Sequence, residues 1–261
     1  MEPVRDLAVV LRVIPYEERH KIVTALTENH GRISVIARNA VQSRRFGPGL
    51  ENFAASDWMF THRPGAEIGA LTELSLRRTF SEIPKEFERL ALAGFFNEIL
   101  LRVTQPWESC SELFRLHSNA LAILDEGLPP THLSFLANVY LGKILIWYGT
   151  QPLWTRCESC QKPLESFSGE SVLTGILEST AWRCPSCESN GSLERAGHQF
   201  SASALGLVWA ALAEPLKRGV LEKEPEAQAQ AQLFQWMTRL LAFHIPGFDQ
   251  LNLKTLRFLG F

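Results

Sequence analysis

Four of the five cysteines fall in two C-x-x-C pairs, and this pattern limits what the chain can fold into more than any other feature. The pairs are Cys157 with Cys160 and Cys184 with Cys187. A C-x-x-C turn presents two thiolates to one ion, and two such turns complete a tetrahedral zinc site. Cys110 stands alone near a predicted helix, where we expect a small buried apolar side chain.

The predicted zinc ion is structural, because four sulfur ligands leave no coordination position for water and therefore no Lewis-acid chemistry. The spacer, residues 161–183, is slightly longer than in the usual zinc ribbon, and Val172–Leu177 fits inside it as a short hairpin. Arg156 and Arg183 each precede a pair and are expected to offset thiolate charge. Two alternatives stay open: a redox-active pair, or thiols left from a site lost in evolution.

Residues 1–80 are predicted to form a small closed β-barrel. Their apolar and alternating runs are separated by the turn residues Asn29-His30-Gly31 and by a loop at 42–49 that contains Gly and Pro. About five strands in this length, without room for long helices, are typical of such a barrel. We expect the strands at residues 4–15, 22–27, 32–38, 57–63 and 68–80.

From Pro84 onward, apolar residues recur with a helical period. Proline and glycine mark several of the points where these runs begin or end. We expect helices at residues 84–103, 113–124, 133–147, 201–213 and 227–245, and a short helix or an extended arm at 251–261.

The composition is that of a soluble globular protein of the cytosol. Hydrophobic residues make up 46% of the chain and charged residues 21%, so a packed core is expected rather than disorder. The longest stretch without Asp, Glu, Lys or Arg is Ala196–Ala213, and its apolar part is well short of the ~20 residues that a bilayer crossing needs. We therefore expect no contact with a membrane.

Positive charge is concentrated near the N-terminus, although the whole chain has a formal net charge of −2. The window Asn29–Leu50 holds four arginines and no acidic residue, which suits contact with a polyanion. Small barrels commonly bind single-stranded nucleic acid through a positive groove with exposed aromatic rings. The candidate contacts are Lys21, Arg32, Arg38, Arg44, Arg45 and Phe46. A solvated loop for the arginines and a core position for Phe46 are the competing interpretations.

The sequence lacks the motifs of common enzyme classes. It contains no G-x-x-x-x-G-K-[ST], no G-x-S-x-G, no H-E-x-x-H and no K-x-D-G, and its seven histidines do not occur at metal-ligand spacing. We therefore expect no catalytic residues and no enzymatic activity.

Several short motifs follow one another in order along almost the whole chain. They comprise Arg12, Pro15-Tyr16-Glu17-Glu18, Ile22-Val23, Leu26-Thr27, His30-Gly31-Arg32-Ile33, Val35, Ala37-Arg38, Arg44-Arg45-Phe46, Leu50, Phe53, Leu145, Tyr148-Gly149, Pro152, the first cysteine pair and Leu253–Leu259. In this order they resemble RecO, a family of bacterial recombination mediators. Glu17 and Asn39 stand where the family usually has Gly, and Asn tolerates the left-handed backbone that glycine would supply.

The resemblance implies an α+β multidomain protein. Its parts would be an N-terminal OB-fold barrel at 1–80, a helical domain in two segments at 81–152 and 199–261, and an inserted four-cysteine zinc module at 153–198. The implied function is non-catalytic: such proteins bind single- and double-stranded DNA, anneal complementary strands and, with RecR, help RecA onto DNA coated by single-strand-binding protein (SSB). The helical domain would dock the acidic, apolar C-terminal tail of SSB, and the protein would act in the cytoplasm, at the nucleoid.

Two other classes of function are compatible with the same residues. One is an OB-fold and zinc-ribbon factor that binds nucleic acid without mediator activity, which a comparison of RNA with DNA binding would separate. The other is a zinc or redox enzyme, which would be set aside if all four thiols hold one metal and no turnover occurs.

Overall fold

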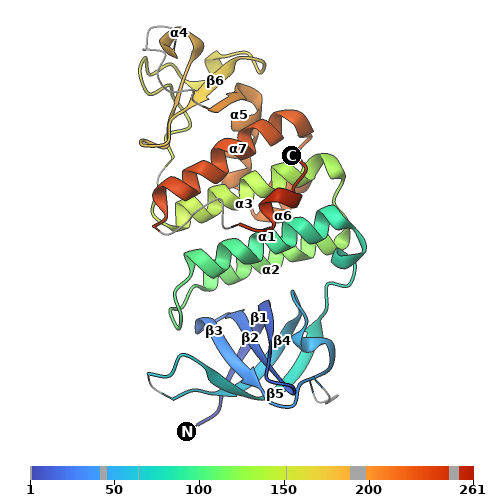
Figure 1. Ribbon diagram of the computed structural model, residues 1–261. Coiled ribbons are helices and arrows are strands. Elements are labelled where there is room, and N and C mark those ends of the chain that lie inside the picture. The colour runs from blue at the N-terminus through green and yellow to red at the C-terminus, as the bar shows by residue number, and fades with distance from the viewer. Residues whose placement is uncertain (1, 42–45, 64, 151, 189–197, 247–252) are drawn as a thin grey trace. The chain divides into compact units, whose positions relative to one another are not determined.

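The structure, a computed structural model, describes the chain except for residues 1, 42–45, 64, 151, 189–197 and 247–252. It divides into two compact units, Met1–Glu126 and Gly127–Phe261 (Figure 1). The first unit contains a barrel and two helices, and the second contains further helices with a small sheet and the cysteine pairs. This is the α+β architecture expected from the sequence.

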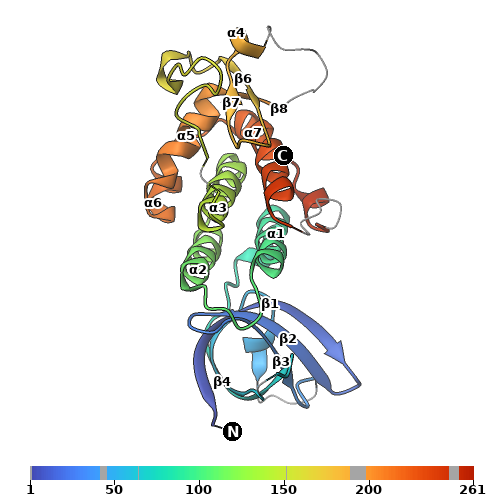
Figure 2. The same cartoon turned by 90° about the vertical axis from the view of Figure 1, so that its left-hand side faces the viewer.

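Five strands and two helices make up the first unit. The strands close a barrel in the order β1-β2-β3-β5-β4, in which β3 and β5 run parallel and the other neighbours antiparallel (Figure 2). The small barrel predicted from the sequence is confirmed. The elements are β1 (Val4–Tyr16), β2 (His20–Thr27), β3 (Gly31–Ala37), β4 (Ala55–Thr61), β5 (Gly69–Arg78), α1 (Phe87–Val103) and α2 (Ser111–Glu126), with short 3-10 helices at Gly47–Leu50 and Ile83–Lys85.

Alternate side chains of each strand point into the barrel and fill it. Successive residues of a strand face opposite sides, so the positions between these core residues face outward. A bulge between Val10 and Arg12 shifts the register of β1, after which Val13 packs inward and Arg12 and Ile14 face outward. The core residues of β2 and β3 are Val23, Ala25, Ile33, Val35 and Ala37.

Two turns of the barrel use the left-handed backbone conformation that glycine adopts most easily. Glu17, at the tip of the β1–β2 hairpin, has a φ of 53°, and Asn39, just after β3, has a φ of 56°. These are the two positions at which RecO-like sequences usually carry Gly. Both residues therefore adopt the backbone shape that a glycine would favour there.

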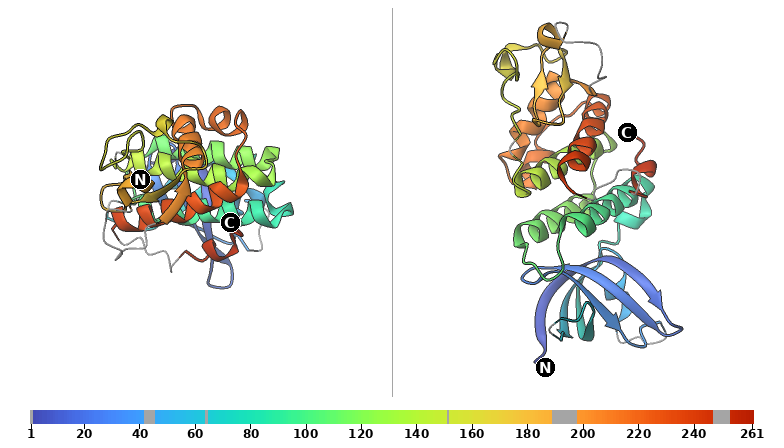
Figure 3. Two further views of the ribbon diagram at one scale, coloured as in Figure 1. Left: turned by 90° about the horizontal axis from the view of Figure 1, so that it is seen from above. Right: turned by 60° about the vertical axis from the view of Figure 1, so that its left-hand side comes forward.

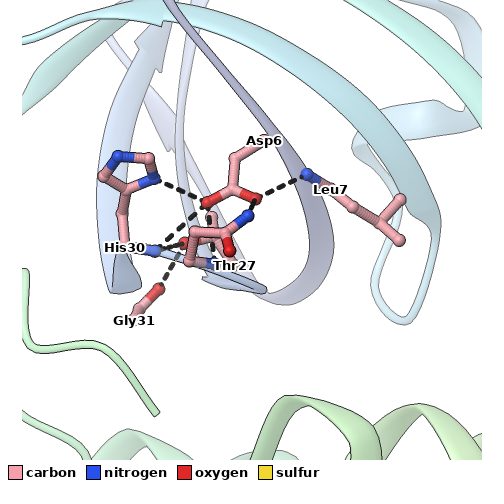
Figure 4. A network of polar contacts seen from close by, with 6 residues as sticks. Asp6, Leu7, Thr27, His30 and Gly31 are labelled. Atoms are coloured by element: carbon pink, nitrogen blue, oxygen red, sulfur yellow. Dashed lines mark hydrogen bonds and ion pairs between the residues drawn. The ribbon is translucent and has the colours of Figure 1, made fainter. Parts of the chain in front are cut away.

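A buried carboxylate pins the β2–β3 turn to the first strand (Figure 4). The side chain of Asp6 is fully buried and accepts hydrogen bonds from the backbone N–H groups of Leu7, Asn29 and His30. It also accepts from Asn29 Nδ2 (2.9 Å) and lies 2.6 Å from His30 Nδ1. Because a buried carboxylate needs such donors, the turn and the start of β1 hold each other in place.

The segment that joins α1 to α2 completes the edge of β3. The register of β3 and β5 contains two residue pairs, at Val35 and Ile36, so the first half of β3 lacks that neighbour. Pro106 forms a parallel bridge with Arg32, and the N–H of Trp107 donates to the carbonyl of Arg32 (3.0 Å). The linker thus pairs with the half of β3 that β5 leaves unpaired.

Other contacts tie both helices to the barrel. Asn97 of α1 donates its Nδ2 to the carbonyl of Leu11 (2.8 Å), and Arg78 of β5 pairs with Asp125 of α2 (2.8 Å). These contacts place α1 and α2 in one compact unit with the barrel, whereas the sequence placed a boundary at residue 80. The expected division into 1–80, 81–152, 153–198 and 199–261 stays a prediction.

The second unit combines helices with a small sheet (Figure 3). This sheet has three antiparallel strands in the order β7-β6-β8. The sequence missed α6, which is too short to show a helical period, and the predicted tail contains a 3-10 turn, Leu256–Phe258. The described residues include no helix with the length and apolar character that a membrane crossing requires. The elements are α3 (Leu133–Trp147), β6 (Val172–Gly175), β7 (Trp182–Arg183), α4 (Pro185–Glu188), β8 (His198–Ser201), α5 (Ala202–Leu212), α6 (Leu216–Leu221) and α7 (Ala227–His244).

Polar contacts position α5 and α7 on the buried helix α3. Asn138 of α3 donates to the carbonyl (2.9 Å) and to Oε1 (2.8 Å) of Gln230 in α7, and both residues are buried. Lys143 Nζ donates to the carbonyls of Leu212 (3.0 Å) and Glu214 (2.9 Å) at the end of α5, and burial lowers the pKa of this amine. Three of these bonds go to backbone carbonyls and one goes to a side-chain oxygen, and together they fix the neighbours of α3.

We expect Gly31→Ala to lower the free energy of unfolding by roughly 3 kcal/mol. Gly31 has a φ of +66°, and an added Cβ would lie 1.8 Å from the carbonyl oxygen of Glu108 in the linker. Gly47→Ala is the matched control, because Gly47 also has a positive φ (+48°) but no atom of the described residues within 4 Å of the added Cβ. Urea unfolding of both variants is the measurement, and equal losses would contradict a role for the close approach.

Candidate metal centre and nucleic-acid interface

The two cysteine pairs converge on one point. The Sγ atoms of Cys157, Cys160, Cys184 and Cys187 all lie within 4.8 Å of one another. A tetrahedral ion with metal–sulfur bonds of about 2.3 Å holds its sulfurs about 3.8 Å apart. The Sγ atoms of Cys160 and Cys184 are 3.8 Å apart, so the cluster has the dimensions of a four-sulfur metal site.

Backbone donors favour the ionised form of the most buried sulfur. Burial opposes ionisation of Cys157, but the N–H groups of Cys160, Cys184 and Ser159 outweigh it and lower the pKa of this thiol to about 7. Hydrogen bonds to the sulfurs of Cys184 and Cys160 raise the pKa of Cys187 to about 12. Four sulfurs this close therefore need a cation to balance their charge before all can be thiolates, and the residues present fit a divalent metal ion.

The cysteine cluster is anchored to the helices of its own unit. Trp182 Nε1 donates to the carbonyl of Trp154 (2.9 Å) in the segment that follows α3, and the N–H of Glu158 donates to the carbonyl of Trp182 (2.9 Å). The ring of His244, the last residue of α7, lies with Nε2 2.7 Å from the carbonyl of Leu177. The segment that carries the four cysteines thus links the end of α3 to the end of α7. This link is a structural role.

The two arginines that precede the cysteine pairs have partners other than the sulfurs. Arg156 donates to the carbonyl of Gln161 (3.2 Å), which closes the first C-x-x-C turn. Arg183 pairs with the carboxylate of Glu158 (3.2 Å). The expectation that these arginines offset thiolate charge is replaced by a role in holding the module's backbone.

Phe46 lies in the core of the barrel. Its side chain is 4% exposed and belongs to the cluster that includes Val35, Trp58 and Phe60. The structure therefore favours the core interpretation, and the ring offers no surface for stacking a base. Arg44 and Arg45 lie outside the described residues.

Arg32 holds the end of a helix. Its Nε and Nη2 donate to the carbonyl of Thr104 at 3.2 and 3.1 Å, and Thr104 is the C-terminal capping residue of α1. Burial lowers the pKa of this guanidinium. A cation at a helix C-terminus also meets the negative end of the helix dipole. Arg32 is thus part of the contact between barrel and helix, which its place in a basic window did not indicate.

Cys110, near Arg32, is buried as expected. Desolvation raises the pKa of its thiol to about 11, so the group stays neutral.

Lys21 and Arg38 lie together at the other end of the β2–β3 pair. Lys21 is paired with Ala37, the residue before Arg38, and the exposed Arg38 follows the last residue of β3. The N–H of Asn39 donates to His20 Nδ1 (3.0 Å), which ties this turn to the start of β2. Of the predicted contacts that the structure describes, these two cations are accessible at one edge of the barrel.

The sequence missed an open face beside these cations. We define the open face as six outward residues that pair across three strands in two rows, Arg12–Thr24–Ser34 and Ile14–Ile22–Ile36. Arg12 is exposed, and the hydroxyl oxygens of Thr24 and Ser34 lie 2.9 Å apart. Strict alternation from the inward Ala8 and Val10 would point Arg12 into the barrel, so its outward position depends on the bulge and the row appears only with the strand register.

Two family models match the chain in consecutive segments. The model described as "Recombination protein O N terminal" matches residues 1–80, and "Recombination protein O C terminal" matches residues 84–250. The chain belongs to the RecO family. The resemblance drawn from the motifs is thereby confirmed.

Relatives named "DNA repair protein RecO" occur in several bacteria. The protein of Desulfatibacillum aliphaticivorans is 28% identical over 268 residues, which cover 99% of this chain and 97% of the relative. The protein of Anaeromyxobacter sp. (strain K) is 32% identical over 165 residues, covering 63% of this chain and 64% of the relative. That of Listeria monocytogenes is 27% identical over 169 residues, or 65% of each chain. The Anaeromyxobacter alignment therefore spans less than two thirds of the relative.

We expect Arg32→Ala to lower the free energy of unfolding by about 2 kcal/mol, because the carbonyl of Thr104 loses charged hydrogen-bond donors in a half-buried contact. Arg38→Ala, the matched control, removes an exposed arginine near the other end of β3 and should change stability by less than about 0.5 kcal/mol. Chemical unfolding of both variants is the measurement. Losses of the same size would show that the contact with Thr104 does not stabilise the fold.

Proposed function

We propose that this RecO-family chain is a DNA-binding recombination mediator. It binds single- and double-stranded DNA, anneals complementary strands and, with RecR, assists RecA loading onto DNA coated by SSB. The observation that carries the proposal is family membership across both parts of the chain, residues 1–80 and 84–250. The barrel with exposed cations at one edge supports it, because small barrels of this kind bind single strands on such a surface.

The DNA-contacting residues that we propose are Lys21, Arg38 and Arg12, together with Arg44 and Arg45, which the sequence predicts. The first three are accessible on neighbouring parts of β1, β2 and β3, whereas Arg32 is engaged by α1. Two strands repel each other through their phosphates, and guanidinium and ammonium groups that bind phosphate lower this repulsion. Annealing then needs no bond to be made or broken by the protein.

Docking partners complete the proposal. We propose two protein partners, RecR and the acidic, apolar C-terminal tail of SSB. The tail would bind to the helical domain. We also propose that the protein acts in the cytoplasm, at the nucleoid. Support comes from RecO membership alone, since no short motif marks either surface.

The metal that we propose is a structural zinc ion bound by all four cysteines of the cluster. Soft thiolate ligands in a tetrahedral four-sulfur arrangement favour zinc or iron, and a site without an open position supplies folding energy rather than catalysis. The spacing of the sulfurs and the donors around Cys157 support this assignment.

The DNA proposal predicts that DNA binding becomes less dependent on salt when a residue that contacts phosphate is replaced. For each single-strand phosphate contact removed, the slope of log affinity against log salt should fall by about 0.7. We expect this for Arg38→Ala and Lys21→Ala, with slower annealing of complementary strands. Arg5→Ala is the matched control, because Arg5 is exposed on β1 where that strand pairs with β4, and it should leave both quantities unchanged.

The measurements are fluorescence anisotropy over a salt series and annealing of SSB-coated strands with RecR present. Unchanged slopes in both variants would reject the proposed interface. Annealing of bare strands without any effect on SSB-coated strands would reject the mediator function and leave a nucleic-acid-binding factor.

The metal proposal predicts one zinc ion per chain. Cys157→Ser should abolish its retention and loosen the second unit, because the binding free energy of a structural zinc is also folding free energy. Cys110→Ser is the control, since Cys110 lies outside the cluster. Elemental analysis with limited proteolysis would test both variants. Iron in place of zinc, or full zinc retention by Cys157→Ser, would refute the assignment.

A further inference from the structure

Three isoleucines form a row across the open face. Ile14 pairs with Ile22, and Ile22 pairs with Ile36, so one outward side chain from each of β1, β2 and β3 lies in line. Ile14 is 38% exposed, and Ile22 and Ile36 are partly exposed. Outward residues nearer the helices, such as Val9 and Leu26, are buried. The row is therefore an apolar strip left uncovered by the described part of the first unit.

Cationic and hydroxyl groups flank this strip on both sides. The neighbouring row carries Arg12, Thr24 and Ser34, roughly 7 Å away at two residues per repeat. Beyond the strip on the other side lies the exposed Arg38, two residues after Ile36, whereas Lys21 is paired with the core residue Ala37 and points to the opposite face of the sheet. The carboxylate of Glu17 is at the hairpin tip and pairs with His20 (3.5 Å). Positive charge on two sides of an apolar strip suits a strand with charged phosphates and less polar sugars.

The strip differs from the usual single-strand site in one respect. Such sites stack bases on aromatic rings, which contributes about 1–3 kcal/mol per base and holds the base faces against the protein. Here Phe46 is in the core, and branched aliphatic side chains occupy the row. The aromatic ring on this side of β1 is Tyr16, which pairs with His20 at the hairpin tip, outside the three-stranded part of the face.

We propose that the open face holds a DNA strand by its phosphates and sugars, with the bases unstacked from the protein and directed away from the sheet. Phosphates contact Arg12 and Arg38, and sugars lie over the isoleucine row. The inference rests on the proposed function and specifies how its strand is held. Because the pairing edges stay accessible, a second strand can pair without displacing the first from the protein.

The first test uses the unaltered full-length chain and oligo-dT. Permanganate oxidises unstacked thymines, so thymines bound by the chain should react at least as fast as in free DNA. Protection of bound thymines would overturn the proposal while leaving DNA binding intact. Absence of any binding to oligo-dT would instead reject the proposed function.

The second test adds a stacking surface. Ile36→Trp should bind oligo-dT about tenfold more tightly, protect thymines from permanganate and anneal complementary strands more slowly. Met59→Trp is the matched control, because Met59 faces outward on β4 between Arg5 and Glu73, and it should change none of these. Tyr16→Leu should change affinity less than twofold.

Three results would contradict the inference. Unchanged affinity and annealing in a folded Ile36→Trp variant would show that the strand does not lie over the row. A large loss of affinity in Tyr16→Leu would indicate stacking after all. Loss of RecR binding by Ile36→Trp with unchanged DNA affinity would assign the row to a protein partner. Where a variant fails to fold, the permanganate test on the unaltered chain still decides.

Discussion

The first unit depends on how its barrel closes. β3 and β5 pair over a short parallel stretch near Val35, and the linker between α1 and α2 supplies the missing neighbour at Arg32. Gly31 has to be a glycine at this seam, because the linker's backbone occupies the space of a Cβ. Contact with the linker at this end of β3 buries part of the barrel's outer surface. The remaining outer surface, which includes the two rows of the open face, stays accessible.

Because of this division of the surface, the two arginines in and just after β3 have different environments. Arg32 donates its hydrogen bonds to the carbonyl of Thr104, whereas Arg38, six residues later, is exposed. The strand annealing that we propose requires the protein to bind phosphate without occupying the bases. An aliphatic strip between cationic edges meets both conditions, since it adds apolar contact without offering a π-surface.

The second unit is organised around a buried helix and a sulfur cluster. Asn138 and Lys143 of α3 satisfy polar groups of its neighbours, and the cysteine module joins the ends of α3 and α7 through Trp182 and His244. Metal binding would therefore stabilise helix packing as well as the module. A four-cysteine site of this kind has no open coordination position and therefore serves the fold.

The sequence by itself determined the barrel strands, the main helices, the four clustered cysteines and the family, because alternation, helical period and C-x-x-C turns are local patterns. The bounds expected for the helix 133–147 agree with those of α3. Only the tertiary structure decided that Phe46 is core, that Arg32 caps α1 and that Arg12 joins the open face. These outcomes depend on strand register and on contacts between residues far apart in the chain. Local sequence patterns do not specify either.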